Sequence, residues 1–330
     1  MKKGLSKRVI KLLVTLVAAA MMAIIILHHN PLAVQEEENI KKVVACIIIV
    51  VAMAVFYRFY DRLVSLPMEL WQSKELIWKL AKNDFKNRYA GSYLGRLWAF
   101  AQPVTTVLLY WFVFDYVMQA KRQLLSEGID APYVLWLTAG LVPWFYFTEA
   151  INNGTTALLE YSYLVKKVVF KISIIPIIKI IAATFTHLFF IVFMLVLYVA
   201  MGYPLDIHLL QLPYYSLCMF VFVLAISYST CAMVIFFRDL LQIVNIGLQI
   251  GMWATPILWS IATVSEGIQK ILKINPVFYI VNGYRSAMFE KTWFWEDFYS
   301  TMYFWIVTFV FFGIGALIFR RLKVHFADVL

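Results

Sequence analysis

Long, unbroken runs of apolar residues dominate this sequence and constrain its fold more than any other feature. A helix needs about 20 apolar residues to cross a hydrocarbon core about 30 Å thick, and only helices and closed barrels satisfy their backbone hydrogen bonds inside such a core. The runs are continuous rather than alternating, which argues against a barrel. The sequence therefore predicts an all-α integral membrane protein. The expected spans are residues 12–27, 43–57, 97–118, 133–152, 174–201, 212–236, 240–261 and 300–319.

The composition is typical of a chain that has little water-facing surface. Only 15% of the 330 residues are charged, against about 25% in a soluble domain. A net charge of +10 would suggest nucleic acid in a soluble protein. Here the basic residues lie beside the apolar runs, as in cytoplasmic loops, so no nucleic-acid partner is expected. Cys46, Cys218 and Cys231 lie in apolar segments without paired spacing, which indicates neither a disulfide framework nor a metal site.

The first 62 residues are predicted to form a separate hairpin of two spans. A basic head before an apolar run is also typical of a signal peptide, and the small residues at 18–20 would suit cleavage. However, the run continues past these alanines, and a second run follows the acidic link at 36–38. An uncleaved hairpin over residues 1–62, with both ends in the cytoplasm, is the preferred interpretation.

Residues 70–96 are too polar to span a membrane. Ile77, Ala81, Phe85 and Tyr89 recur at a spacing of four, while lysines occupy other faces. This pattern predicts a basic amphipathic helix that lies in the membrane interface, with Ser73 as its N-cap. The alternative is a surface helix of a soluble domain, which the adjacent apolar runs disfavour.

The distribution of charge sets the expected topology. Placing residues 70–96 inside also places the basic segment 154–173 and the basic tail 320–323 inside. The expected outer segments are short or of mixed charge, and they are residues 119–132, 202–211 and 262–299. This bias of Lys and Arg favours a multi-pass membrane protein, surrounded by membrane lipids, with both termini in the cytoplasm.

Patterns of catalytic chemistry are missing from the sequence. It has no G-x-x-x-x-G-K-[ST] loop to cradle a nucleotide phosphate, no H-E-x-x-H pattern and no paired carboxylates in one segment. We therefore expect no catalytic residue, cofactor or metal site on this chain and no enzymatic activity of its own. A chain of this kind that moves cargo uphill must take its energy from a partner.

Polar residues inside spans are functional candidates by default. Gln242, Asn245 and Gln249 recur at helical spacing, and this polar stripe either lines a channel or hydrogen-bonds to neighbouring helices. Aromatic residues make up 17% of the chain. They either form the aromatic belt of the membrane interface or line the same path as the polar stripe, for which Tyr110 and Trp253 are candidates.

Several short motifs follow one another in a fixed order from residue 76 onward. They are LIWKLAKNDFKNRYAGSYLGRLWAFAQP at 76–103, GLVPW at 140–144, LVKKVVF at 164–170, FRD at 237–239, TPI at 255–257, NP at 275–276, YR at 284–285 and FRRLKVHFAD at 319–328. In this order they resemble the type 2 ABC exporter permeases that move polysaccharides, O-antigens and teichoic acids. The resemblance covers about residues 70–330. It departs from the family pattern at Lys171, where members usually carry Pro.

This resemblance implies a six-helix type 2 ABC exporter transmembrane domain over residues 97–330. It implies a coupling helix at about 154–168, which transmits the motion of a separate ATPase, and re-entrant helices at about 262–299, which gate the outer mouth of a channel. The residues expected to contact the ATPase are Asp84, Arg88, Glu160, Tyr163, Lys166 and Lys167. The residues expected at the outer gate are Pro256, Asn275, Pro276, Tyr279, Tyr284 and Arg285.

The function expected from the resemblance is export of a lipid-linked cell-surface polysaccharide across the plasma membrane of a bacterium. Aromatic side chains along the glycan path would stack on its sugars. Two copies of the chain would pair around a channel with two copies of an ABC ATPase, which would bind ATP and Mg²⁺. Type 2 ABC exporters of drugs or other lipids share this topology. A membrane-embedded glycosyl- or acyltransferase would need clustered acidic or histidine residues at one membrane face, and none is evident. An ion-driven transporter would show inverted repeats and charges near span centres, of which this chain has few.

Overall fold

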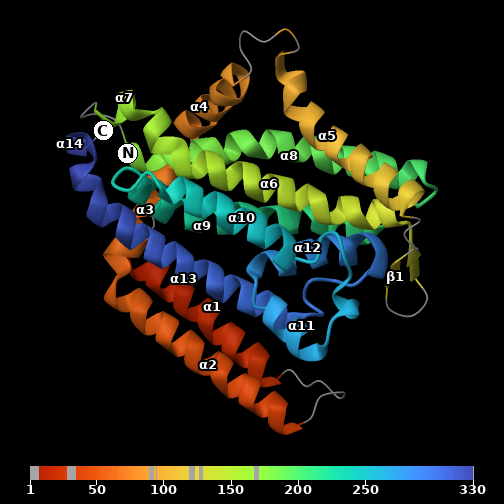
Figure 1. Cartoon of the computed structure of the whole chain (residues 1–330). Coiled ribbons are helices and arrows are strands. Elements are labelled where there is room, and N and C mark those ends of the chain that lie inside the picture. Colours follow the sequence, from red (N-terminus) through yellow and green to blue (C-terminus); the bar gives the residue numbers. More distant parts are fainter. Residues whose placement is uncertain are drawn as a thin grey trace. The chain divides into compact units, whose positions relative to one another are not determined.

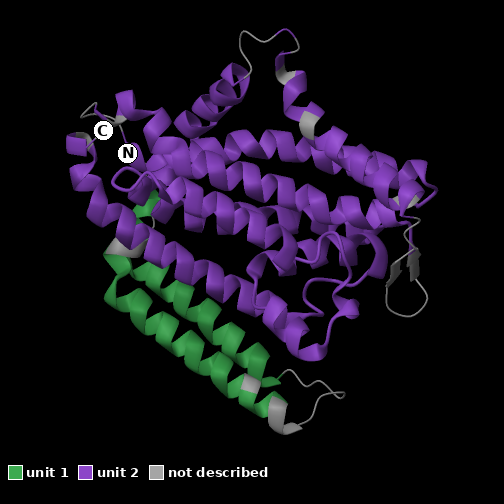
Figure 2. Ribbon diagram, viewed as in Figure 1, with its two compact units in different colours: residues 1–68 green, residues 69–330 purple. Residues whose placement is uncertain are grey.

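The computed structural model describes residues 7–27, 35–88, 93, 95–118, 123–125, 129–166 and 171–329. The chain divides into two compact units, residues 1–68 and 69–330 (Figure 2). The division falls within one helix, α3 (Tyr60–Gln72). The first unit contains the predicted hairpin, and the second contains every motif of the family resemblance.

The first unit is built on a hairpin of two apolar helices, α1 (Lys7–Leu27) and α2 (Gln35–Arg58). A 2.6 Å hydrogen bond joins the hydroxyls of Thr15 and Tyr57 across the hairpin. Many of the Val, Leu and Ile side chains of both helices are exposed, as lipid-facing side chains of a membrane hairpin must be. Both helices are long and apolar enough to cross a membrane, as the predicted two-span hairpin requires.

Helices also make up most of the described part of the second unit (Figure 1). In chain order they are α4 (Lys74–Asn87), α5 (Trp98–Trp111) with its π-helical continuation η2 (Phe112–Val117), α6 (Tyr133–Glu160), α7 (Ser162–Val165), α8 (Ile175–Ala200), α9 (Leu212–Val234), α10 (Leu240–Ala254), α11 (Glu266–Leu272), α12 (Pro276–Arg285) with its π-helical continuation η7 (Ser286–Glu290), α13 (Phe298–Leu322) and α14 (Phe326–Val329). Short 3-10 turns are η1 (Gly95–Leu97), η4 (Ile172–Ile174), η5 (Ile207–Gln211), η6 (Ile261–Thr263) and η8 (Lys323–His325). An antiparallel pair of three-residue strands, β1 (Gln123–Leu125) and β2 (Ile129–Ala131), lies in the segment expected to be an outer loop.

α6 is the centre of the second unit. It packs against α8 and α9, and α9 packs in turn against α13 (Figure 1). Buried residues occur on all sides of α6 along most of its length, as expected for an apolar helix surrounded by other helices. A 2.8 Å hydrogen bond between the hydroxyls of Thr155 and Thr230 joins α6 to α9. By contrast, no residue of α10 is buried.

Each predicted span corresponds to an apolar helix. Within the described residues, six helices are long and apolar enough to cross a membrane, and α5 and α10 are apolar but shorter. The chain is therefore a multi-pass membrane protein. α10 ends at Ala254 rather than running to residue 261, because a proline forces the residue before it out of the helical region. That residue, Thr255, is extended, with a ψ of 121°.

The predicted coupling helix at 154–168 is not a separate helix. α6 continues without a break to Glu160, and α7 adds a single turn after it. This part of α6 lies close against α9, since a Cβ on Gly154 would overlap the hydroxyl of Ser227. Residues 167–170 lie outside the described residues.

Candidate functional site

α4 packs on α8 through its apolar stripe. Ile77 and Ala81 are buried against Ile178, and the ring of Phe85 lies 5.5 Å from that of Phe185. The lysines of α4 occupy its exposed faces. The spacing of four therefore correctly predicted an amphipathic helix, and the structure shows which surface its apolar stripe covers.

Three carboxylates and two basic side chains meet where α4, α6 and α8 come together. We call them the charge cluster: Asp84, Arg88, Glu149, Glu160 and Lys179. Lys179 of α8 is at its centre, with its Nζ 2.7 Å from Asp84 Oδ1 and 2.6 Å from Glu160 Oε2. Lys179 and Asp84 are only 7% and 9% exposed. Because buried charges are tolerated only when they are paired, this contact ties α4 to both α6 and α8.

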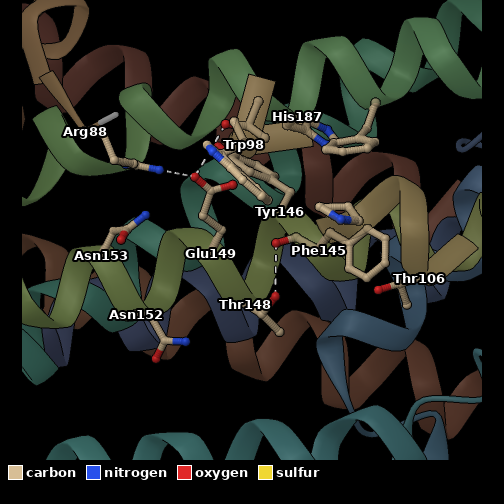
Figure 3. A pocket seen from close by; sticks show the side chains of 14 residues that line it. Arg88, Trp98, Thr106, Phe145, Tyr146, Thr148, Glu149, Asn152, Asn153 and His187 are labelled. Carbon is tan, nitrogen blue, oxygen red and sulfur yellow. Dashed lines mark hydrogen bonds and ion pairs between the residues drawn. The ribbon is translucent and has the colours of Figure 1, made fainter. Parts of the chain in front are cut away.

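Arg88 forms the other half of the charge cluster. Its guanidinium pairs with Glu149 of α6 (Figure 3) and lies 3.8 Å from Asp84, one helical turn earlier on α4. Thr186 of α8 donates a 3.5 Å hydrogen bond to Glu149. The same three helices therefore meet at both ends of the cluster.

Tyr161 completes the surroundings of Asp84. It follows the last residue of α6, and its hydroxyl donates a 2.7 Å hydrogen bond to Asp84 Oδ1. Burial and the hydrogen bond to Asp84 raise the pKa of the Tyr161 phenol. The phenol therefore keeps its proton and remains a donor to the carboxylate. Lys179 Nζ also lies 5.0 Å from the centre of the Tyr161 ring.

A cavity of about 430 Å³ adjoins the charge cluster. Side chains from the end of α4 and from α5, α6 and α8 surround it (Figure 3). The lining residues are Arg88, Trp98, Ala99, Pro103, Thr106, Phe145, Tyr146, Thr148, Glu149, Asn152, Asn153, Thr186, His187 and Phe190. The wall thus combines aromatic rings with amides, hydroxyls and one ion pair.

A second polar site fixes the irregular segment that follows the end of α10. Arg285, at the end of α12, is buried, and its Nη1 and Nη2 donate hydrogen bonds of 2.7 and 2.9 Å to the carbonyl oxygens of Pro256 and Ile257. Its guanidinium also lies 3.5 Å from the centre of the Trp136 ring. A Cβ on Gly140 would come within 2.9 Å of Arg285 Nη2, so α6 needs a glycine where the arginine crosses it. The guanidinium thus satisfies two backbone carbonyls of the irregular segment that follows α10.

α12 is a short helix inserted among the spans. Asn275 begins it by accepting a 3.0 Å hydrogen bond from the backbone N–H of Val277, and its amide nitrogen donates to Thr255 at 2.8 Å. Pro276 occupies the first helical turn, where its missing N–H costs nothing. The hydroxyl of Tyr284 lies 3.0 Å from His187 Nε2. The histidine is therefore held by a tyrosine of α12.

Tyr279 of α12 joins two further helices. Its hydroxyl lies 3.1 Å from that of Tyr214 on α9 and 2.8 Å from that of Thr301 on α13. The residues predicted at the outer gate are thus brought together around α12. By contrast, the isoleucines of α11 at 268 and 271 are exposed, so this apolar part of the segment 262–299 is not packed into the unit.

α10 carries its polar stripe on an exposed surface. Gln242, Asn245 and Gln249 are all exposed, and so is Trp253, at 65%. Tyr110 lies apart from this stripe on α5, with its ring against Phe114. The structure therefore groups four of the five predicted channel residues on one helix.

Comparison with known proteins identifies the family of this chain. A family model described as ABC-2 type transporter matches residues 75–289, from α4 through α12. The chain belongs to the ABC-2 type transporter family. The O-antigen export system permease protein RfbA of Myxococcus xanthus is 29% identical over 230 residues, 69% of this chain and 85% of that protein. The protein of the same name from Klebsiella pneumoniae is 28% identical over 258 residues, 78% of this chain and 95% of that protein.

The residues predicted to contact an ATPase lie in two different environments in the ABC-2 domain. Asp84, Arg88 and Glu160 belong to the charge cluster. Tyr163 on α7 is 58% exposed, and Lys166 just after it is exposed as well, whereas Lys167 lies outside the described residues. Contact of either group with an ATPase stays a prediction.

Lys179, Glu149 and Tyr161 were not among the predicted site residues of this ABC-2 domain. Lys179 stands alone in the apolar segment 174–183, and an ionisable residue inside a span is itself a signal of function. That signal could have identified the lysine. Its pairing with Asp84, 95 residues earlier in the chain, could not have been inferred, because it depends on how α4 folds back onto α8.

Proposed function

We propose that this chain is the membrane-spanning permease subunit of an ABC exporter for a lipid-linked cell-surface polysaccharide. The observation that carries the proposal is its similarity to O-antigen export permeases across most of their length, up to 95%. O-antigens, capsules and teichoic acids are cargoes of this chemical class. The exporter resides in the plasma membrane of a bacterium. Both chain ends are cytoplasmic in this proposal, supported by the basic side chains Arg320 and Arg321 in the last turn of α13.

Energy reaches the chain from a separate ABC ATPase, which binds the ATP and Mg²⁺. The exposed lysines of α4, together with Tyr163 and Lys166, form the surface on which this ATPase docks. Motion of α4 is passed to α6 and α8 through the charge cluster, because separating buried ion pairs is costly. The charge cluster is therefore the connection between the docking surface and the spans.

Two copies of the chain and two copies of the ATPase make up the exporter. The exposed face of α10, with its glutamines and asparagine, supports a pairing in which polar side chains of both copies face a common path. Exposed polar groups within a membrane are costly unless protein or water covers them. The segment around α12 and Arg285 then forms the outer gate of that path.

Purification and cell-surface analysis test the proposal together. We expect the tagged chain to purify with an ABC ATPase, and its deletion to remove a surface polysaccharide while the lipid-linked precursor accumulates inside the cell. Replacing the catalytic glutamate of that ATPase by glutamine should give the same defect. The proposal would be refuted if the chain purified without an ATPase and every surface polysaccharide stayed unchanged. The polysaccharides would have to stay unchanged both when the chain is deleted and when candidate ATPases are inactivated. Altered drug resistance with normal surface glycans would indicate a drug exporter.

A further inference from the structure

The cavity beside the charge cluster has two neighbouring stripes of side chains along α6. Residues three and four apart on a helix lie side by side, and the lining residues follow this spacing. One stripe is Tyr146, Glu149 and Asn153, and the other is Phe145, Thr148 and Asn152. Each stripe therefore presents one aromatic ring and two polar groups, and Trp98 and Phe190 add rings from α5 and α8.

Two buried nitrogen atoms in the cavity wall have no hydrogen-bond partner among the described residues. They are the amide nitrogen of Asn153 and Nδ1 of His187. Asn153 lies on the same side of α6 as Glu149 and Arg88 (Figure 3). Since buried polar groups in proteins are nearly always hydrogen-bonded, Asn153 and His187 have hydrogen-bonding capacity that the described residues leave unused.

The charges around the cavity disfavour an anion. Arg88 is the cation in its wall, and it already pairs with Glu149 and lies near Asp84. In the whole charge cluster, three carboxylates face two cations. A phosphate here would meet Glu149 directly and would compete with it for Arg88, at the cost of desolvating a second negative charge. A neutral polar molecule meets no such penalty.

We propose that this cavity binds one neutral sugar unit of the exported glycan. A pyranose ring has an apolar C–H face and a rim of hydroxyl groups that both donate and accept hydrogen bonds. Its C–H face lies on the aromatic rings, while its hydroxyls accept from Asn153 and bond to the Arg88–Glu149 pair. The cavity volume of about 430 Å³ lies within the range of small-molecule sites. This inference rests on the proposed function, since it assigns a subsite to the same cargo.

Photolabelling with two matched probes tests the sugar site. Both probes carry the same diazirine-bearing alkyl chain, and one ends in glucose while the other ends in phosphate. The full chain with its ATPase is placed in lipid nanodiscs, and labelled peptides are identified by mass spectrometry. We expect the glucoside to label residues 98–106 and 145–153 saturably, and the phosphate probe to leave them unlabelled. Equal labelling by both probes overturns the assignment to a neutral sugar.

Two substitutions and their matched controls link the labelling to the cavity. Asn153→Leu should weaken glucoside binding roughly tenfold, the effect of leaving one buried hydrogen bond unmade. Trp98→Leu, at a half-exposed ring, should also weaken glucoside binding, because the sugar loses its stacking partner. This variant tests the site if Asn153→Leu fails to fold. Asn87→Leu and Trp71→Leu make the same changes at exposed positions outside the cavity and should bind as wild type. Unchanged binding in both cavity variants overturns the proposal.

The sugar site and the exporter function fail in distinguishable ways. If the chain exports a polysaccharide but the glucoside labels other segments, only the sugar site is wrong. If no surface polysaccharide depends on the chain, the exporter function is wrong, whatever the probes label.

Discussion

Lys179 shows how a single buried charge organises its surroundings. It lies in an otherwise apolar helix, and its ammonium group is held by Asp84 and Glu160 and lies over the ring of Tyr161. The lysine was visible in the sequence as an isolated charge in a span. Its partners lie on α4, on α6 and just after α6, so their arrangement became evident only from the fold.

Replacing Lys179 by methionine should strongly destabilise the chain. Asp84 would remain buried without its ammonium partner, and breaking a buried ion pair in this way costs about 3–5 kcal/mol. Chemical unfolding of the detergent-solubilised chain measures the loss. Lys82→Met, at an exposed lysine of α4, should be nearly neutral. The double variant Asp84→Leu, Lys179→Met should recover part of the stability, because it removes both buried charges. A single variant as stable as wild type would contradict the buried pair.

Gly283 provides a second test at the scale of one residue. A Cβ at this position of α12 would overlap the ring of Tyr215 on α9. Gly283→Ala should therefore displace α12 and cost about 1–3 kcal/mol of unfolding free energy, as overpacked cores do. Gly267→Ala on α11 is the matched control, since a Cβ there meets open space. Thermal inactivation of the two variants compares them directly, and equal losses would mean that α12 isn't packed on α9 as described.

At the scale of helices, sequence patterns predicted the presence of elements better than their ends. The spacing of Ile77, Ala81 and Phe85 predicted α4, because one stripe of a surface helix must be covered. The pattern could not reveal that α6 runs on to Glu160 along α9, with which Gly154 is in close contact. Ser73 precedes α4 as predicted, but its side chain makes no capping hydrogen bond.

The junction of α6 and α7 should couple ATP hydrolysis to export. Glu160 contacts Lys179, while Tyr163 projects from α7 into solvent, so the pair connects the charge cluster to an exposed surface. The double variant Glu160→Gln, Tyr163→Ala should retain ATP hydrolysis but export at least about fivefold less polysaccharide per ATP, the loss of about 1 kcal/mol of coupling. Glu296→Gln, at an exposed carboxylate of the outer segment, should behave as wild type. Normal export by the double variant would remove this junction from the coupling role.

At the scale of the whole molecule, the exposed surface of α10 supports the proposal that this chain is one subunit of a larger exporter. The sequence left open whether its polar stripe lines a channel or bonds to neighbouring helices of the same chain. In the structure Gln242, Asn245 and Gln249 are exposed, which excludes burial against neighbouring helices of this chain. What covers them could not be predicted from one sequence, and in the proposed exporter it is a second copy of the chain.

Cysteine cross-linking should detect that second copy. In a chain whose native cysteines are replaced by alanine, Asn245→Cys should give a covalent dimer with a short bis-maleimide in intact membranes, because α10 helices of two copies face each other. Val192→Cys, on an exposed part of α8, is the control and should remain monomeric on a denaturing gel. A dimer through α8 and none through α10 would place the pairing surface elsewhere.

The boundary near Met68 separates the hairpin from the part of the chain that carries the family match. The ABC-2 match begins at residue 75, only a few residues after the compact unit of the hairpin ends. The Klebsiella pneumoniae permease is matched over 95% of its own length but covers 78% of this chain. The hairpin thus lies outside the ABC-2 match, and every ion pair of the charge cluster lies on the other side of this boundary.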